Sequence, residues 1–160
     1  MKKIIKLLLV VAMACSLTSV SYATEKGIEP RVLIEACNGS SNYIVSVSSE
    51  KKELYERTGR YVGAGNSATI STGVAYSVSN SANLSILPEL LSMGFSSTVS
   101  VDASWSDTLN NTTSYMREVG VFRVYKTVTY TSYSYVGGGN CEVRPGRTMK
   151  VYTGWVLDFF

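Results

Sequence analysis

The stretch that decides the fold covers residues 68–86 and reads ATISTGVAYSVSNSANLSI. Its even positions are mostly apolar, and its odd positions are small or polar. Alternation of this kind predicts a β-strand with one buried face. The stretch is far longer than an ordinary strand of about five or six residues. We therefore expect a bend near Gly73 or Asn80.

A second alternating stretch covers residues 95–106 and reads FSSTVSVDASWS, with its apolar positions odd. Residues 87–94 between the two stretches break the alternation, and Pro88 cannot donate a hydrogen bond to a strand ladder. The two stretches predict a long hairpin with an apolar tip. With residues 87–94 as the loop, Ile86 faces Phe95 and Tyr76 faces Trp105 as a cross-strand aromatic pair.

The rest of the chain also favours strands. Short or long runs of β-branched and aromatic residues predict strands at residues 43–47, 117–135, 141–144 and 148–160. Gly137-Gly138-Gly139-Asn140 predicts a hairpin turn, and Pro145-Gly146 is expected to separate the last two strands. The charged residues 48–57 fit a short helix, a solvated strand edge or a loop. Together these patterns predict an all-β protein, with a single antiparallel, sandwich-like domain over residues 36–160.

The first residues predict export. A basic start with Lys2, Lys3 and Lys6 precedes an apolar run at residues 7–17, and Ser21-Tyr22-Ala23 places small side chains before a cleavage point. This is the order of a secretory signal peptide, and the apolar run is shorter than the roughly 20 residues that span a bilayer as a helix. We expect residues 1–23 to be removed, residues 24–35 to form a flexible leader, and the protein to be secreted. In the alternative, a lipoprotein, Cys15 would carry the lipid anchor.

Charge and composition narrow the function. Three of the fifteen basic residues lie in the signal peptide, so twelve basic and twelve acidic residues remain. No basic patch stands out, which argues against a nucleic-acid partner. The chain has no histidine, the commonest general base and metal ligand. We expect a protein that is not an enzyme and uses no metal or cofactor; Glu89, Asp102 and Asp107 are the candidates if paired carboxylates were catalytic.

The hairpin region carries a sharper signal. Between Tyr61 and Met116 there is no lysine or arginine, while nineteen residues are serine or threonine. One interpretation is a sandwich strand pair with one wet face. The other is a membrane-inserting hairpin, because each run reaches the roughly 9–11 residues of a transmembrane strand. Its membrane residues would be Tyr76, Leu84, Ile86, Leu87, Leu90, Leu91, Phe95 and Trp105.

This serine- and threonine-rich, alternating hairpin with an apolar tip resembles the pre-stem of aerolysin-type β-pore-forming toxins over residues 68–106. The resemblance implies a membrane-active, pore-forming protein. Ile28-Glu29-Pro30-Arg31, Ser104-Trp105-Ser106, Arg123-Val124-Tyr125-Lys126 and Cys141 also resemble small secreted Gram-positive β-proteins of uncharacterised function. That second resemblance implies secretion and β-structure.

The first functional hypothesis is an extracellular interaction or surface-binding protein. Tyr125, Tyr133 and Tyr135 share one face of the predicted strand at residues 117–135, where exposed rings could stack on a cell-surface glycan. The alternative hypothesis is the membrane-active hairpin.

The two cysteines after the signal peptide generate a prediction. Cys37 and Cys141 form an even pair in an exported chain, which favours a disulfide over a metal site. Such a bond would stabilise the fold by about 4–5 kcal/mol. We expect the secreted protein to resist alkylation until it is reduced and then to gain two labels by mass spectrometry. Two labels without reductant would contradict the bond.

Overall fold

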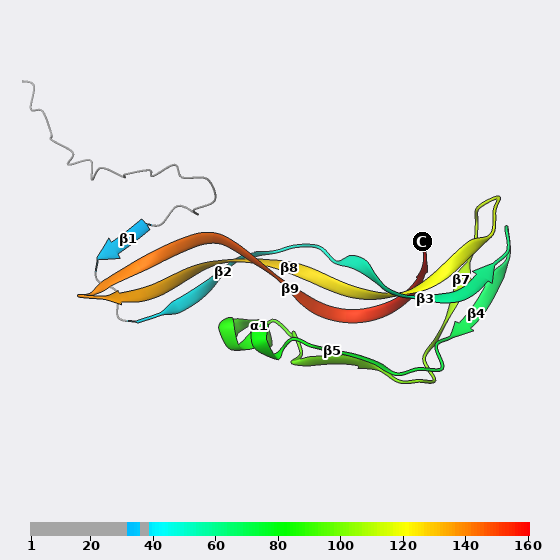
Figure 1. Cartoon of the computed structure of the whole chain (residues 1–160), viewed down its shortest axis with the longest axis horizontal. Helices are drawn as coiled ribbons and strands as arrows, with labels where there is room; N and C mark the ends of the chain where they lie inside the picture. The colour runs from blue at the N-terminus through cyan, green and yellow to red at the C-terminus, as the bar shows by residue number, and fades with distance from the viewer. Residues whose placement is uncertain (1–31, 36–38) are drawn as a thin grey trace, which may run out of the picture. The chain divides into compact units, whose positions relative to one another are not determined.

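Antiparallel β-strands make up most of the described chain, as the sequence predicts (Figure 1). The computed structural model describes residues 32–35 and 39–160, all within the unit Arg31–Phe160. The elements in chain order are β1 (Val32–Glu35), β2 (Ser41–Val47), β3 (Lys51–Val62), β4 (Ser67–Ser71), β5 (Tyr76–Ser79), α1 (Ser81–Ile86), α2 (Glu89–Ser92), β6 (Thr98–Val101), β7 (Ser106–Asn110), β8 (Arg117–Gly137) and β9 (Asn140–Phe159).

The ladder between β8 and β9 is the longest element pair. It runs from Val119 opposite Phe159 to Gly137 opposite Asn140, and the turn uses three glycines at positive φ. The predicted break at Pro145-Gly146 is wrong, because β9 continues through it. Instead, the register of the ladder shifts at this point, between Tyr130 and Ser132 of β8. Pro145 and Gly146 of β9 lie in this irregularity, which accommodates a proline.

The five-stranded sheet has the order β1-β9-β8-β2, and β3 also pairs with β8. The charged residues 51–57 belong to β3, which excludes the helix that their spacing allowed. Glu53 lies opposite Arg123 in this ladder. Its basic partner therefore comes from the neighbouring strand and not from Arg57, the residue that would be one helical turn away. β1 lies within residues 24–35, which the sequence predicts as a leader, and it pairs with the start of β9. Residues 1–31, with the predicted signal peptide and Cys15, lie outside the described residues, as does Cys37.

The segment between β3 and β8 forms the predicted hairpin. Ser67 lies opposite Asn110 in β4–β7, and Ser79 lies opposite Thr98 in β5–β6, with the same register in both ladders. The predicted register is wrong by four residues, since Tyr76 faces Val101 and not Trp105. The reason is the tip: residues 81–92, partly predicted as strand, form α1 and α2. A shift by an even number leaves the same residues on each face, so the predicted faces of β4, β5, β6 and β7 are correct, whereas the predicted faces of residues 81–86 are lost in α1.

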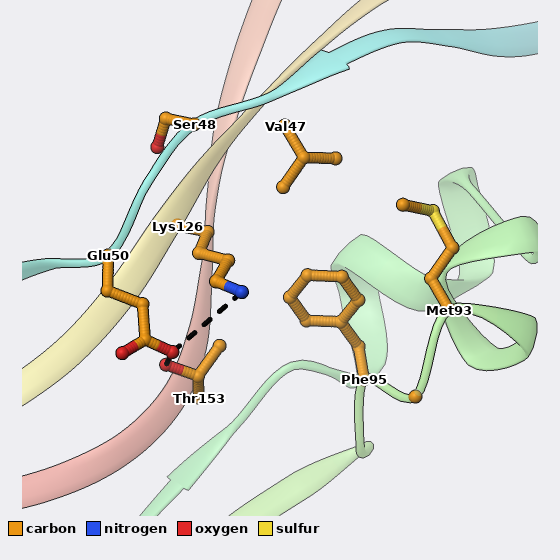
Figure 2. Close-up of a pocket in the computed structure, with 8 residues that line it drawn as sticks. Val47, Ser48, Glu50, Met93, Phe95, Lys126 and Thr153 are labelled. Atoms are coloured by element: carbon orange, nitrogen blue, oxygen red, sulfur yellow. Dashed lines mark hydrogen bonds and ion pairs between the residues drawn. The ribbon is translucent and has the colours of Figure 1, made fainter.

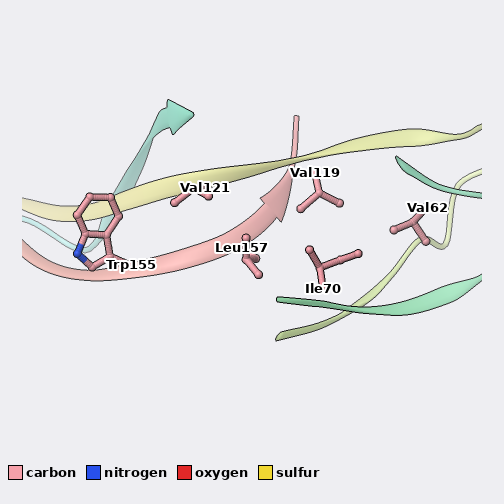
Figure 3. Close-up of a cluster of buried hydrophobic side chains, with 6 residues drawn as sticks. All are labelled: Val62, Ile70, Val119, Val121, Trp155 and Leu157. Carbon is pink, nitrogen blue, oxygen red and sulfur yellow. The ribbon is translucent and has the colours of Figure 1, made fainter. Parts of the chain in front are cut away.

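Two apolar clusters join the hairpin to the sheet. In Figure 3, Ile70 from the hairpin points toward side chains of β8 and β9 such as Val119 and Leu157. The second cluster lies at the tip, where Leu84, Leu87 and Leu90 contact residues of β8 and β9. The sheet therefore covers one face of the hairpin along the two ladders and at the tip, whereas Val74 between the ladders is 54% exposed. No helix within the described part of the chain has the length and apolarity to cross a membrane.

Candidate functional site

Side-chain contacts hold the hairpin to the five-stranded sheet, and no strand of the hairpin pairs with a strand of that sheet in the described residues. In the described residues, each backbone-to-backbone hydrogen bond of residues 67–110 has both of its partners within that segment. The bond from Thr72 N to Trp105 O and the bond from Asn80 N to Ser97 O keep the register of the two ladders. The segment could leave the sheet without breaking its own ladder.

The two faces of the hairpin arms differ in chemistry. Within the two ladders, one face carries Ser67, Thr69, Ser71, Ser77, Ser79, Thr98, Ser100, Ser106, Thr108 and Asn110, all exposed. Gly73, Ala75, Asp102 and Ser104 lie in the turns between the ladders and are exposed as well, and Asp102 is the single charged residue among these positions. The opposite face includes Ile70, Tyr76, Val99, Val101 and Leu109, which pack against the sheet. The hairpin is therefore amphipathic, and the sheet covers its apolar face.

Asn80 interrupts the apolar face and is 1% exposed. Its Nδ2 donates to the carbonyl oxygen of Tyr152 at 2.7 Å and to that of Ser96 at 3.1 Å. Its Oδ1 accepts from the backbone N–H of Tyr152 at 2.9 Å. Asn83, one turn further along, donates to the carbonyl oxygen of Lys150 at 2.6 Å. Because every polar atom of the buried Asn80 amide has a hydrogen-bond partner, these bonds stabilise the hairpin in its position on the sheet. Removing them while the amide stays buried would cost free energy.

An aromatic cluster supports the middle of the hairpin. The ring of Tyr76 lies 5.2 Å from that of Trp155 and 5.8 Å from that of Tyr55, centroid to centroid. The hydroxyl of Tyr76 donates a hydrogen bond to the carboxylate of Glu56 at 3.1 Å, and Trp155 Nε1 donates one to the carbonyl oxygen of Val99 at 3.2 Å. Burial, and then the bond to Glu56, raise the pKa of the Tyr76 hydroxyl. The cluster fixes Tyr76 by both ring contacts and a hydrogen bond.

A charged network lies beside this cluster. The guanidinium of Arg123 sits 5.1 Å from the ring centre of Tyr55 and 5.0 Å from that of Tyr152. Its Nη2 lies 2.8 Å from Glu53 Oε1, and Glu53 also accepts from Lys150 and from the hydroxyl of Tyr152. The hydrogen bond from Lys150 is the main cause of a lowered pKa of the Glu53 carboxyl. Tyr152 thus links the two sites: its side chain contacts the charged network, and its backbone bonds to the side chain of Asn80.

The tip presents apolar side chains on two sides. Leu84, Leu87 and Leu90 are buried against the sheet, whereas Leu91 is 57% exposed and Ile86 41% exposed. Met93, 51% exposed, borders an open cavity of about 460 Å³ between the tip and the sheet (Figure 2). The cavity is lined by Val47, Ser48, Glu50, Met93, Gly94, Phe95, Lys126 and Thr153.

The structure gathers the residues that the sequence singled out for a membrane hairpin. Leu84, Ile86, Leu87, Leu90, Leu91 and Phe95 lie at the tip, and Tyr76 and Trp105 lie half-buried in the arms. Sequence reasoning placed a bend near Gly73 or Asn80 but gave neither Asn80 nor Asn83 a hydrogen-bonding role, although Asn80 is a visible polar residue on the apolar face. It also missed the network of Glu53, Arg123 and Tyr152.

The three carboxylates considered for catalysis lie at separate levels of the hairpin. Glu89 begins α2 at the tip, Asp102 is on the exposed face, and Asp107 lies opposite Ile70 on the other face. Cys141 is fully buried, with its Sγ 3.4 Å from the carbonyl oxygen of Gly39, two residues after Cys37. This neighbourhood is compatible with the predicted disulfide, which stays a prediction. Within residues 32–35 and 39–160, no three acidic or cysteine side chains gather in a group that could hold a metal ion.

Comparison with known proteins returned no relative of this chain: no family model, no curated protein and no solved structure matches it. The function therefore has to be argued from the residues and their geometry.

The charged network generates a prediction on pH. Because the folded pKa of Glu53 lies below its ordinary value of 4.5, the network stabilises the fold fully above that pH and loses its effect as pH falls through the folded pKa. Glu53→Gln should lower the free energy of unfolding by about 1–2 kcal/mol at pH 7, the range for a partly exposed charge-assisted network. Urea unfolding should show this difference between wild type and variant unchanged from pH 7 to 5 and narrowing below pH 4.5.

Glu89→Gln is the matched control, because Glu89 is exposed and makes no ion pair among the described residues. It should leave stability at pH 7 nearly unchanged. A difference for Glu53→Gln that is already constant down to pH 3 would contradict the role of the carboxylate charge.

Proposed function

We propose that this protein is a membrane-active pore former whose hairpin, residues 67–110, leaves the sheet and inserts into a bilayer. The observation that carries the proposal is that the hairpin keeps its own backbone ladder and contacts the sheet by side chains alone. In water, release would expose the apolar face at a cost of about 25 cal/mol per Å². In a bilayer, lipid would cover that face in place of the sheet.

The dimensions of the hairpin support insertion. Trp105 faces Thr72 near one end of the apolar stretch, and Asn80 faces Ser97 at the other. Nine residues of each arm lie in this interval, and they would span about 27 Å once the turns at residues 72–75 and 102–105 are extended into β-strand. The hydrocarbon core of a bilayer is about 30 Å thick. Asp107 lies on the apolar face but beyond Trp105, so it would stay on the water side of an interfacial aromatic residue.

The two faces also fit a transmembrane barrel. Strands of such barrels alternate apolar residues toward lipid with polar residues toward the lumen. The exposed serine and threonine face would line the lumen, and the face now covered by the sheet would meet lipid. One hairpin has two open edges, and lipid offers no hydrogen-bond partners to the backbone groups along them. Several copies would therefore have to join into a closed barrel. The resemblance of the hairpin to the aerolysin-type pre-stem supports the same proposal.

The exposed tip gives a direct test. Leu91 is 57% exposed in the folded chain, so Leu91→Asp should change stability by no more than about 0.5 kcal/mol. During insertion the new carboxylate would have to cross the hydrocarbon core, which adds about 2 kcal/mol to the barrier. We expect dye release from phosphatidylcholine–phosphatidylglycerol vesicles to slow by at least about tenfold.

Val136→Asp is the matched control, because Val136 is 54% exposed and lies on β8 outside the hairpin. It introduces the same charge at a similar exposure and should leave dye release unchanged. Equal slowing by both variants, or intact vesicles with wild-type protein at every lipid composition tried, would contradict insertion of the hairpin.

A second candidate function, binding to a cell-surface glycan, is supported by tyrosines on β2 and β8. Tyr43 is 57% exposed and its ring lies edge-on to that of Tyr133, 5.4 Å between centroids. Tyr135 nearby on β8 is 49% exposed. Exposed aromatic rings of this kind offer apolar faces and a polar hydroxyl to a sugar.

For this candidate, Tyr43→Ala should weaken binding to isolated Gram-positive cell walls by about fivefold to tenfold, equivalent to about 1–1.4 kcal/mol. Tyr115→Ala is the matched control, because Tyr115 is 63% exposed in the loop before β8. A cosedimentation assay with washed walls measures both. Identical binding of the two variants and the wild type would remove the tyrosines as the glycan site.

A further inference from the structure

The long strand β9 has one open edge. β8 pairs with it along one side, while on the other side β1 pairs only with Asn140–Val143. Among residues 32–35 and 39–160 no further strand pairs with β9, so residues 144–159 present an edge without a neighbouring strand. A strand edge of this length is a template for another chain unless something covers it.

The hairpin covers part of this edge with two asparagine side chains. The amide of Asn80 both donates to and accepts from the backbone of Tyr152, and the amide of Asn83 donates to the backbone of Lys150. Lys150 and Tyr152 are alternate residues, whose backbone groups point to the same side of a strand. The N–H of Tyr152 has a single hydrogen, which Asn80 occupies, so that group is not shared with β8. The side-chain amides thus take the place of a neighbouring strand.

We propose that the docked hairpin caps the open edge of β9, and that its release exposes this edge to a strand of a second copy of this chain. The inference rests on the proposed release of the hairpin and adds to it the surface on which copies assemble. It also gives the order of events: as long as Asn80 and Asn83 hold Lys150 and Tyr152, a second strand cannot pair along the middle of this edge.

The partner strand is the other open edge of the sheet. β2 and β3 pair with β8 on one side, and within the described part of the chain nothing pairs with their other side. We expect β9 of one copy to pair with β3 of the next copy. Such a contact joins two different surfaces, so it repeats from copy to copy and closes into a ring when the rotation between neighbouring copies divides a full turn. Both strands run antiparallel to β8, so copies related by rotation about an axis along the strands would pair them in parallel. A closed barrel needs a ring of this kind.

The Asn80→Asp variant tests the cap. A carboxylate still accepts from the N–H of Tyr152, but it cannot donate to the carbonyl oxygens of Tyr152 and Ser96 and would repel them. Sedimentation velocity without lipid should show the wild type as a monomer and the variant as assemblies several-fold larger. Hydrogen exchange should show residues 76–101 of the variant less protected, because its hairpin is released.

Asn110→Asp is the matched control. Asn110 lies at the base of the hairpin on the exposed face, and its Oδ1 accepts from Ser67, a bond that a carboxylate keeps. This variant should remain monomeric. If Asn80→Asp does not fold, Asn83→Ala replaces it, since Asn83 contributes one donor bond to the edge and should shift the monomer toward assemblies in the same direction.

The outcomes separate this inference from the proposed function. A variant with a released hairpin that stays monomeric, or that releases dye while monomeric in solution, would overturn the edge cap. Assemblies of the variant in solution without any dye release would support the edge cap and contradict the pore.

Discussion

Every other described element depends on the ladder between β8 and β9. Its strands, of 21 and 20 residues, are joined by a turn that three glycines at positive φ make possible. β1, β2 and β3 pair with these two strands and not with one another, and both apolar clusters of the hairpin rest on them. A local ladder of neighbouring residues forms at low entropic cost, and it gives the rest of the chain a surface on which to pack.

The hairpin uses this surface without joining it. A segment that shares strands with a sheet can leave only when backbone hydrogen bonds break, and each broken bond in an apolar setting is costly. Apolar burial, in contrast, can be replaced by lipid at small net change, which leaves the hydrogen bonds of Asn80 and Asn83 to β9 as the main cost of release. The hairpin between β3 and β8 is thus attached to the sheet without shared strands, which is the arrangement that the proposed move from water to a membrane would require.

Much of this arrangement could be predicted from the sequence. The period of two correctly assigns the faces of the strands at residues 67–71 and 76–79, because side-chain direction in a strand follows from parity, but it fails over residues 81–86, which form a helix. The register could not be predicted, since it depends on where the tip begins, and residues 81–86 form a helix whose Leu84 belongs to one buried cluster with the distant Val128 and Val151. The continuity of β9 through Pro145 likewise depends on its partner strand. The roles of Asn80 and Tyr152, 72 residues apart, appear only once the chain is folded.

The exposed face of the hairpin has a consequence for the electrical behaviour of the proposed pore. In the extended strands of a barrel, Asp102 would be the single charged side chain of that face, within the nine-residue interval between Trp105 and Ser97. In a barrel built from several copies, these carboxylates would form a ring around the channel, with hydroxyl groups above and below and no lysine or arginine to neutralise them. Such a ring attracts cations and repels anions. Ion selectivity would then be set by one residue per copy, and current through the channel would be carried chiefly by cations.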